Sequence, residues 1–403
     1  MKVVLFDINR LSFEGGAEKY LSEVGIIFNK KGNEVYFVGY CRPIMKLFIW
    51  SSVFLFINPF WKLPKYFTQL KESSPLKKNS DNFITHIPLK LFSLFPFSSE
   101  KKKLKNFLEE ADLILIKNEI AEMIFFWLLN IKNENKHLMI FSSLEYPFAE
   151  SFRSKIHNFI YLSKFYKFLI KKIGKVIISN QEDEKYFIET IKIDKRNLNF
   201  IPYGLNENYF AKPNEIKSVN GFKILFVGRM EEQKGIIYLK QIIENINKDK
   251  KLKNVSFTIV GGGPLEEIPR QLAEKYSNVE YKGQLSPEEV RKFYLRSDLV
   301  IIPSKWETFS YVCLEAQACG CPVVAFNVPG PADIIQNQSG DLIMPKDLTS
   351  FEKSIWKYYK IKKKDIIKYT TFRKNISQTA KLTYSLEKTI KNIEQLANDQ
   401  KFL

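Results

Sequence analysis

The sequence predicts an α/β protein made of two domains, each built around a parallel β-sheet. Short apolar strand patterns alternate with helical patterns through both halves of the chain, which is typical of parallel sheets with crossover helices. Strands such as residues 299–302 are apolar throughout, as a sheet covered on both faces requires. A chain of 403 residues is too long for one ordinary hydrophobic core and has the length expected for two domains.

Residues 1–205 are predicted to form the N-terminal domain. Its strands are expected at residues 2–8, 34–39, 111–116, 137–142 and 175–179. A helix is expected after the first strand, because apolar residues from Ala17 to Phe28 recur at helical spacing and Gly32 follows. Residues 41–100 break the rhythm with many Phe, Trp, Pro and Lys residues and are predicted to be an insertion.

A polar stretch at residues 206–221, which contains Pro213, is predicted to be the interdomain linker. Residues 222–370 then form the second domain. Its strands are expected at residues 222–228, 255–260, 279–282, 299–302 and 322–326, and its helices at residues 235–246, 287–296 and 310–320. Residues 371–403 have apolar side chains at helical spacing and are predicted to form a final helical segment.

Composition narrows the range of partners and chemistries. The formal charge is +18 with a pI near 9.4, which favours anionic partners such as nucleotide diphosphates or anionic lipid. A sequence rich in Lys, Ile, Asn and Phe can also reflect an AT-rich genome. Four cysteines and three histidines without a C-x-x-C pair argue against a zinc site or a disulfide framework. The N-terminus lacks the features of a signal peptide, so a cytoplasmic location is expected.

Two glutamates lie where a predicted strand passes into a helix. The strand at residues 299–302 ends at Pro303, Glu307 falls in the following loop, and Glu315 falls in the second turn of the next helix. Ligands bind at this end of parallel strands, and a helix N-terminus favours a diphosphate. Carboxylates beside a diphosphate would be repelled unless they bind hydroxyl groups. We therefore assign Glu315 to a ribose and Glu307 to a sugar, against the alternative of two solvated surface residues.

A further loop carries two cations suited to a diphosphate. Arg229 follows the first strand of the second domain, and Lys234 lies at the start of the next helix. Arginine can bind phosphate through two parallel hydrogen bonds and lysine through its point charge. The alternative is a solvated loop in which Glu231 and Glu232 are the partners of these cations.

In the first domain, Gly15 and Gly16 at a predicted helix start would let a ligand approach the backbone closely, although a plain helix cap is equally consistent with them. The G-x-G-x-x-G fingerprint is absent, which disfavours a nicotinamide-dependent dehydrogenase.

The stretch at residues 303–324 resembles the E-x7-E motif of glycosyltransferase family 4. The resemblance includes Pro303, Ser304, Glu307, Glu315, Ala316, Ala318, Cys319, Gly320, Pro322, Val323 and Val324. Gly228, Arg229, Lys234 and Gly235 are similar to the G-R-x4-K-G phosphate motif of that family. The resemblance implies the GT-B fold, in which two Rossmann-like domains face a deep cleft and a C-terminal helix crosses back to the first domain.

The resemblance also implies roles for individual residues. Glu307 would orient the donor sugar, while Arg229 and Lys234 would neutralise the leaving nucleoside diphosphate. Gly15 and Gly16 would face the sugar diphosphate or the acceptor. The backbone around Gly283 and Leu285 would meet the base. The amides at the helix start would come from Thr308, Phe309, Ser310, Tyr311 and Val312.

Several residues depart from the family pattern. Thr308 and Ser310 stand where glycine is usual, and Asp333 is shorter than the usual glutamate. Many relatives carry a histidine after the fifth strand of the first domain, where this chain has Ser143 and Glu145 as possible substitutes. The nearest histidine, His137, lies at the start of the predicted strand, too early for that role.

The resemblance therefore implies a retaining glycosyltransferase that uses a UDP- or GDP-sugar as its donor substrate, with no cofactor and no metal. A glycan or lipid-linked acceptor in surface polysaccharide, lipopolysaccharide or glycolipid synthesis is expected. The missing histidine keeps open a non-catalytic nucleotide-sugar-binding protein, and an epimerase or hydrolase of the sugar nucleotide is a further alternative. Nucleic-acid binding is disfavoured, because the aromatic residues lack the spacing of a known module.

Residues 44–61 within the predicted insertion are almost wholly apolar. Lys46, Asn58 and Pro59 make the segment a poor membrane-spanning helix, and Trp, Tyr and Lys lie at its edges. This pattern is typical of peripheral contact with an anionic leaflet. An ordinary core helix of the first domain is the alternative.

Overall fold

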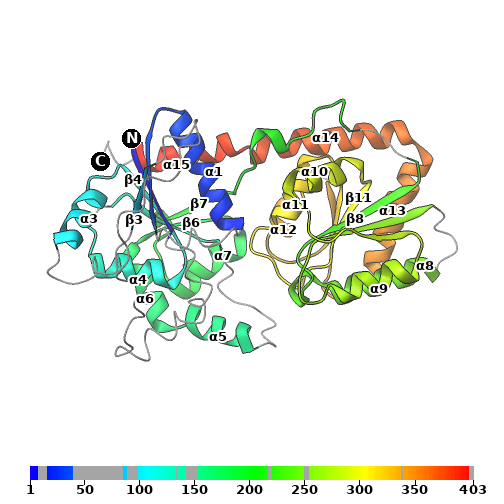
Figure 1. The fold of residues 1–403 in the computed structure, drawn as a ribbon. Coiled ribbons are helices and arrows are strands. Elements are labelled where there is room, and N and C mark those ends of the chain that lie inside the picture. Colours follow the sequence, from blue (N-terminus) through cyan, green and yellow to red (C-terminus); the bar gives the residue numbers. More distant parts are fainter. Residues whose placement is uncertain are drawn as a thin grey trace, which may run out of the picture.

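The computed structural model describes residues 1–7, 16–39, 85–88, 99–132, 134–141, 152–216, 220–248, 254–336 and 339–398. Within these residues, two parallel sheets form, one in each half of the chain, and helices flank both of them (Figure 1). This arrangement confirms the predicted α/β class with two parallel-sheet domains. No helix formed by the described residues is long and apolar enough to cross a bilayer.

The first domain is built around a sheet in which the described strands follow the order β3-β2-β1-β4-β5-β6-β7. The central strand β1 pairs in parallel with β2 and β4, and its residues Val3–Phe6 are fully buried, which explains their uninterrupted apolar sequence. The elements are β1 (Lys2–Phe6), α1 (Gly16–Lys30), β2 (Glu34–Gly39), β3 (Thr85–Pro88), α3 (Ser99–Glu109), β4 (Leu113–Lys117), α4 (Ile120–Leu129), β5 (Lys136–Met139), α5 (Phe152–Tyr161), α6 (Lys164–Ile173), β6 (Lys175–Ile178), α7 (Gln181–Tyr186), the π-helical turn Phe187–Ile191 and β7 (Leu198–Phe200).

The second domain has the strand order β10-β9-β8-β11-β12-β13 within its described residues. The buried strand β11 lies between β8 and β12 and leads directly into the loop of Glu307. The elements are β8 (Phe222–Val227), α8 (Ile236–Lys248), β9 (Val255–Val260), α9 (Glu267–Lys275), β10 (Val279–Tyr281), α10 (Pro287–Arg296), β11 (Leu299–Ile302), α11 (Tyr311–Ala318), β12 (Val323–Phe326), α12 (Pro331–Ile334), β13 (Gly340–Ile343) and α13 (Leu348–Lys364). The C-terminal segment then forms α14 (Ile366–Tyr384) and α15 (Leu386–Asn398).

The predicted strands agree with the structure where they are long and apolar, and they fail at short or mixed ones. Strands at residues 255–260 and 299–302 have the predicted bounds, whereas β1 and β5 end earlier than predicted. Strands β3, β7 and β13 were not predicted from the sequence. Strand β7 has three residues and β13 is only partly buried, so neither shows a strand pattern. Strand β3 lies inside the predicted insertion; the apolar run at residues 44–61 is outside the described residues.

The C-terminal segment returns to the first domain, as the family resemblance implies (Figure 1). Helix α14 packs against α11 of the second domain, and α15 packs against α1 of the first. At the crossing point, Leu205 and Leu386 are joined by a backbone hydrogen bond of 2.8 Å. Gly204 allows this approach, because a Cβ atom there would lie 2.7 Å from the Leu386 backbone. Lys31 and Glu394 form an ion pair of 2.7 Å that ties α15 to the end of α1.

Candidate donor-sugar site

Glu307 lies in a buried cage of polar groups in the loop after β11. Its two carboxylate oxygens accept hydrogen bonds from Lys234 Nζ at 2.7 and 2.9 Å. The Ser304 hydroxyl donates to the same carboxylate at 2.8 Å. The side chains of Lys234 and Glu307 are only 18% and 7% exposed. Two predicted site residues that are 73 positions apart in the sequence are therefore in direct contact.

Gly235 makes this contact possible. Its φ is +71°, and a Cβ atom at this position would lie 1.8 Å from the Pro303 carbonyl oxygen. The loop that carries Lys234 can therefore approach the end of β11 only because residue 235 is glycine. Gln233 Nε2 adds a hydrogen bond of 3.3 Å to the Trp306 carbonyl oxygen, which joins the two loops a second time.

Arg229 differs from Lys234 in its environment. Its side chain is 70% exposed, and its guanidinium group forms an ion pair of 2.7 Å with Glu231. The backbone of its loop is fixed, because Met230 N donates to the Gly262 carbonyl oxygen at 2.9 Å. Of the two predicted phosphate-binding cations, Lys234 is held in place by Glu307. Arg229 is a long, exposed side chain on a loop whose backbone is fixed.

The start of α11 leaves backbone amides available to an anion. The N–H groups of Cys313 and Leu314 donate to the Ser310 carbonyl oxygen at 3.0 and 3.2 Å. Those of Tyr311 and Val312 have no hydrogen-bond acceptor within the described residues. Ser310 itself has φ +63° and ψ +73°, in the left-handed region that disfavours residues with a Cβ atom by about 1 kcal/mol or more. Such strain is common at binding sites.

Glu315 is held by Tyr294, a residue outside the predicted site. The Tyr294 hydroxyl on α10 donates to the Glu315 carboxylate at 3.1 Å. Tyr294 is fully buried, and burial together with the nearby Glu315 carboxylate raises the pKa of its hydroxyl well above the usual value. The tyrosine therefore stays protonated and remains a donor. Its position in a helical apolar pattern gave no signal beyond that of a core residue.

The predicted base-binding loop is joined to the glycine-rich turn after β9. The Gly261 N–H donates to the Gly283 carbonyl oxygen at 2.7 Å, and the Tyr281 hydroxyl donates to the Gly261 carbonyl oxygen at 2.8 Å. Gly283 has φ +64°, so glycine is favoured there by backbone conformation alone. Leu285 packs partly buried against the core. These loops all lie at the carboxyl ends of the second sheet.

The first-domain candidates are only partly described. Gly16 is the first residue of α1, whereas Gly15, Ser143 and Glu145 lie outside the described residues. His137 lies within β5 and is fully buried. Burial and the charges of Lys175 and Lys136 lower the pKa of its imidazole to about 3. His137 is therefore a neutral core residue, in agreement with the expectation that it does not replace the family histidine.

The loop between Glu307 and α11 also contacts the first domain. Asn180 Nδ2 donates to the Thr308 carbonyl oxygen at 3.0 Å, and the Gln181 N–H donates to Asp333 Oδ1 at 3.1 Å. Asp333, which the sequence places where relatives have a longer carboxylate, therefore accepts a hydrogen bond from the other domain.

Aromatic rings continue this interface around Tyr203. It stacks on Phe141 at 5.0 Å between ring centroids and meets Phe309 at 5.2 Å and Tyr20 at 4.8 Å. The candidate site is thus at the domain boundary.

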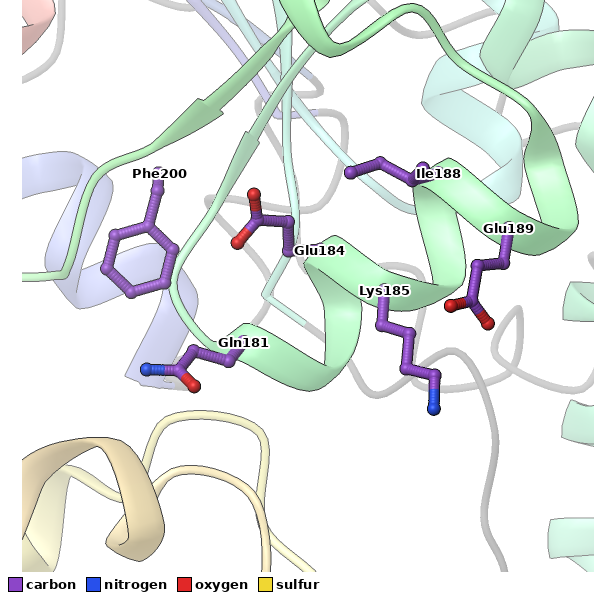
Figure 2. Close-up of a pocket in the computed structure, with 6 residues that line it drawn as sticks. All are labelled: Gln181, Glu184, Lys185, Ile188, Glu189 and Phe200. Carbon is purple, nitrogen blue, oxygen red and sulfur yellow. The ribbon is translucent and has the colours of Figure 1, made fainter.

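A cavity of about 410 Å³ lies beside this boundary, on the first domain (Figure 2). Figure 2 shows Phe200 at the end of β7 on one side and the side chains of α7 and the following turn on the other. Gln181, which contacts Asp333, is at its edge. Glu307 and Lys234 do not line it. Among the described residues, no group of three or more His, Cys, Asp or Glu side chains is arranged to hold a metal ion.

The similarity to known proteins is concentrated in the second half of the chain. Residues 209–381 match the family model described as glycosyl transferases group 1. An uncharacterised glycosyltransferase of Methanocaldococcus jannaschii is 31% identical over 207 residues, covering 48% of this chain and 51% of the relative. The UDP-Gal:alpha-D-GlcNAc-diphosphoundecaprenol alpha-1,3-galactosyltransferase of Escherichia coli is 27% identical over 199 residues, covering 46% and 51%. The chain thus spans about half the length of the curated relatives it matches.

Similarity to solved structures, unlike the sequence matches, covers the whole chain. The structure of Anabaena HepE in complex with UDP and glucose aligns with a TM-score of 0.66 and 16% identity, and the alignment covers 100% of both chains. At this identity the likeness shows the fold alone. The chain has the GT-B fold, and its residues 209–381 are similar to the glycosyl transferases group 1 family.

Proposed function

We propose that this protein is a retaining glycosyltransferase that transfers a hexose from a UDP- or GDP-sugar to a glycan or lipid-linked acceptor. The observation that carries the proposal is the buried Glu307 carboxylate, held by Lys234 and Ser304 beside the N-terminus of α11. A carboxylate, a lysine ammonium and free helix amides at one strand end combine the groups that a sugar and its diphosphate require.

In this proposal the donor diphosphate binds the amides of Tyr311 and Val312, and the positive end of the helix favours its charge. Lys234 has three N–H donors, so it can keep Glu307 in place and also bind a phosphate oxygen. Arg229 can leave Glu231 and fold over the diphosphate, because both side chains are at the surface. As the bond to the sugar breaks, negative charge grows on the diphosphate, and these donors stabilise it without a metal ion.

In the proposal, Glu307 and Glu315 bind different parts of the donor. Glu307 lies next to the lysine that binds the diphosphate, where its carboxylate can accept sugar hydroxyls and favour positive charge at the anomeric carbon. Glu315 is held by Tyr294 on the second turn of α11. In the proposal its carboxylate accepts the ribose hydroxyls. Retention of configuration follows when the acceptor attacks on the face from which the diphosphate leaves.

Two relatives support the choice of substrates. The E. coli relative is named for a UDP-galactose donor and an acceptor linked to diphosphoundecaprenol, and HepE binds UDP and glucose. We infer that this protein also uses a UDP-hexose and a lipid-linked acceptor. Such a role belongs to surface polysaccharide or lipopolysaccharide synthesis at the cytoplasmic face of a membrane.

A non-catalytic donor-binding protein is the second candidate. The observation that favours it is the buried, neutral His137, which cannot contact a donor sugar from the core of the first domain. A glycosyltransferase and a non-catalytic protein would both bind the donor. Only a measurement of turnover distinguishes these two functions.

The test is a turnover assay with radiolabelled UDP-galactose, UDP-glucose and GDP-mannose, with and without a polyisoprenoid lipid extract. We expect label to enter the lipid fraction, and Glu307→Gln to reduce the rate about 100- to 1,000-fold, the usual effect of losing one transition-state contact. Glu274→Gln, which changes an exposed carboxylate of the same domain, is the matched control and is expected to be active. Label released only as free sugar would identify a hydrolase. Binding without turnover would identify the non-catalytic protein.

A further inference from the structure

Helices α4, α5 and α6 of the first domain lie side by side (Figure 1). They expose large apolar side chains. Phe159 on α5 is 81% exposed. On α4, Trp127 and Leu128 are each 40% exposed, and on α6 Phe165 and Phe168 are each 39% exposed. We call these five residues the aromatic surface. Single exposed apolar residues are common, but a set of this size on neighbouring helices marks an interaction site.

Part of the aromatic surface is a packed cluster. The Trp127 ring meets the Phe165 and Phe168 rings edge to face, at centroid distances of 6.1 and 5.7 Å. Phe165 and Phe168 lie nearly parallel at 6.4 Å. The rings therefore hold one another in fixed positions at the protein surface, and little side-chain freedom would be lost on binding.

Helix α6 is oriented so that its basic and aromatic face points away from the core. Its other face is buried through Tyr166, Leu169, Ile170 and Ile173. The Tyr166 hydroxyl donates to the Asn118 carbonyl oxygen at 2.9 Å, and the Ser163 hydroxyl caps the helix by accepting from the Tyr166 N–H. The exposed face is thus fixed by the fold.

The charged side chains of α5 and α6 are all basic. Residues 152–175 contain seven basic residues and no aspartate or glutamate; the basic residues are Arg153, Lys155, Lys164, Lys167, Lys171, Lys172 and Lys175. Lys155, Lys164, Lys171 and Lys172 are exposed, and Lys172 Nζ lies 5.4 Å from the centroid of the Phe168 ring. Aromatic rings and lysines are therefore interleaved on the same surface.

We propose that the aromatic surface and its lysines bind the surface of an anionic lipid bilayer. Aromatic rings in a basic helical face enter the boundary between lipid headgroups and acyl chains, while the lysines stay at the anionic headgroups. Each lysine near such a surface contributes about 1 kcal/mol, which corresponds to about a fivefold change in the partition coefficient. Because the charges of residues 152–175 are all positive, anionic lipid is favoured over a protein partner whose surface carries both positive and negative charges.

The residues of the aromatic surface differ from residues 44–61, for which the sequence predicts membrane contact and which lie outside the described residues. The inference deepens the proposed function, since it would bring the enzyme to a membrane-borne acceptor. Vesicle binding is measured without donor or acceptor, so its outcome does not depend on glycosyl transfer.

The test is co-sedimentation of the full chain with vesicles of phosphatidylcholine alone or mixed with phosphatidylglycerol. We expect binding only to the mixed vesicles, weakened by salt because screening shortens the range of the charges. Lys164→Gln with Lys171→Gln is expected to lower the partition coefficient about 30-fold. Phe159→Ser is expected to lower it about tenfold. Phe159 is so exposed that its loss leaves folding intact, which a thermal melt of the variant verifies.

Matched controls locate the binding surface. Lys388→Gln with Lys391→Gln removes the same charge from α15, at the opposite edge of the first domain (Figure 1), and is expected to bind like the wild type. Ile367→Ser removes a side chain that is 77% exposed beside a basic stretch of the second domain, and no change is expected. The proposal is overturned if the wild type ignores anionic vesicles at low salt or if either control weakens binding as much as the α6 variants. It is also overturned if Phe159→Ser leaves binding unchanged, because the lysines alone would then explain the binding, as they would for any polyanion.

Discussion

The contact between Lys234 and Glu307 can be measured directly with a double-mutant cycle. The perturbations are Lys234→Met, Glu307→Gln and the two together, which remove each charge with little change in side-chain size. Lys234→Met leaves the buried Glu307 carboxylate with the Ser304 hydroxyl as its remaining hydrogen-bond donor from the cage. Removing one partner of a buried pair is costly, because the other charge stays out of water.

The expected magnitude follows from the geometry. Two unit charges about 4 Å apart attract by about 4 kcal/mol at an effective dielectric constant of about 20. Lys234 is 18% exposed and Glu307 7% exposed, so water can reach part of the lysine and the net effect is smaller. We expect Lys234→Met to lower the free energy of unfolding by about 3 kcal/mol and Glu307→Gln by about 2 kcal/mol. The double variant should lose about 3 kcal/mol, which gives a coupling energy of about 2 kcal/mol.

The assay is urea denaturation followed by circular dichroism for all four proteins. Ser304→Ala is the control for the hydroxyl alone and is expected to cost about 1 kcal/mol. Additivity of the two single variants within about 0.5 kcal/mol would show that the charges are not coupled, and the cage around Glu307 would then have no energetic basis.

Three further predictions test the backbone and the buried ionisable groups. Gly235→Ala should abolish donor binding, because its Cβ atom would clash with the backbone at the end of β11. Gly283 has open space around it, so Gly283→Ala should cost only about 1–2 kcal/mol of stability. Equal losses of stability for the two variants in thermal melts would contradict this. Burial holds the pKa of His137 at about 3, below its usual value, so the wild type should lose stability as the pH falls from about 6.5 toward 3, and His137→Leu should flatten a melting series across that range. Burial raises the pKa of Asp183 to about 7, so stability should fall as the pH rises from about 4 to 7, and a retained slope in Asp183→Asn would assign it to another group.

Much of the second domain could be predicted because its strands are apolar runs with clear ends. Strand β11 and helix α10 have the predicted bounds. The helix begins with a capping box between Ser286 and Glu289 and has Pro287 at its first position. The short strands β7 and β13 were missed, because three or four partly buried residues carry no distinct periodicity.

The site was predictable as a set of residues but not as a set of contacts. The sequence places Lys234 and Glu307 in separate loops, and only the sheet order β8–β11 brings those loops together. Tyr294 could not be distinguished from a core tyrosine, although its hydroxyl holds Glu315. The exposed rings of α6 were not predicted, because in the sequence they alternate with the buried residues of the same helix.

Calorimetric titration with UDP-, GDP- and ADP-sugars, and with pyrophosphate, tests most directly whether the second domain holds a sugar nucleotide through Glu315. We predict that at least one sugar nucleotide binds, and that Glu315→Gln weakens it by roughly tenfold or more while pyrophosphate binding changes little, because hydrogen bonds to a charged group contribute about 1.5–3 kcal/mol. Absence of binding by every sugar nucleotide at millimolar concentration, or equal losses for the sugar nucleotide and for pyrophosphate, would contradict the assignment.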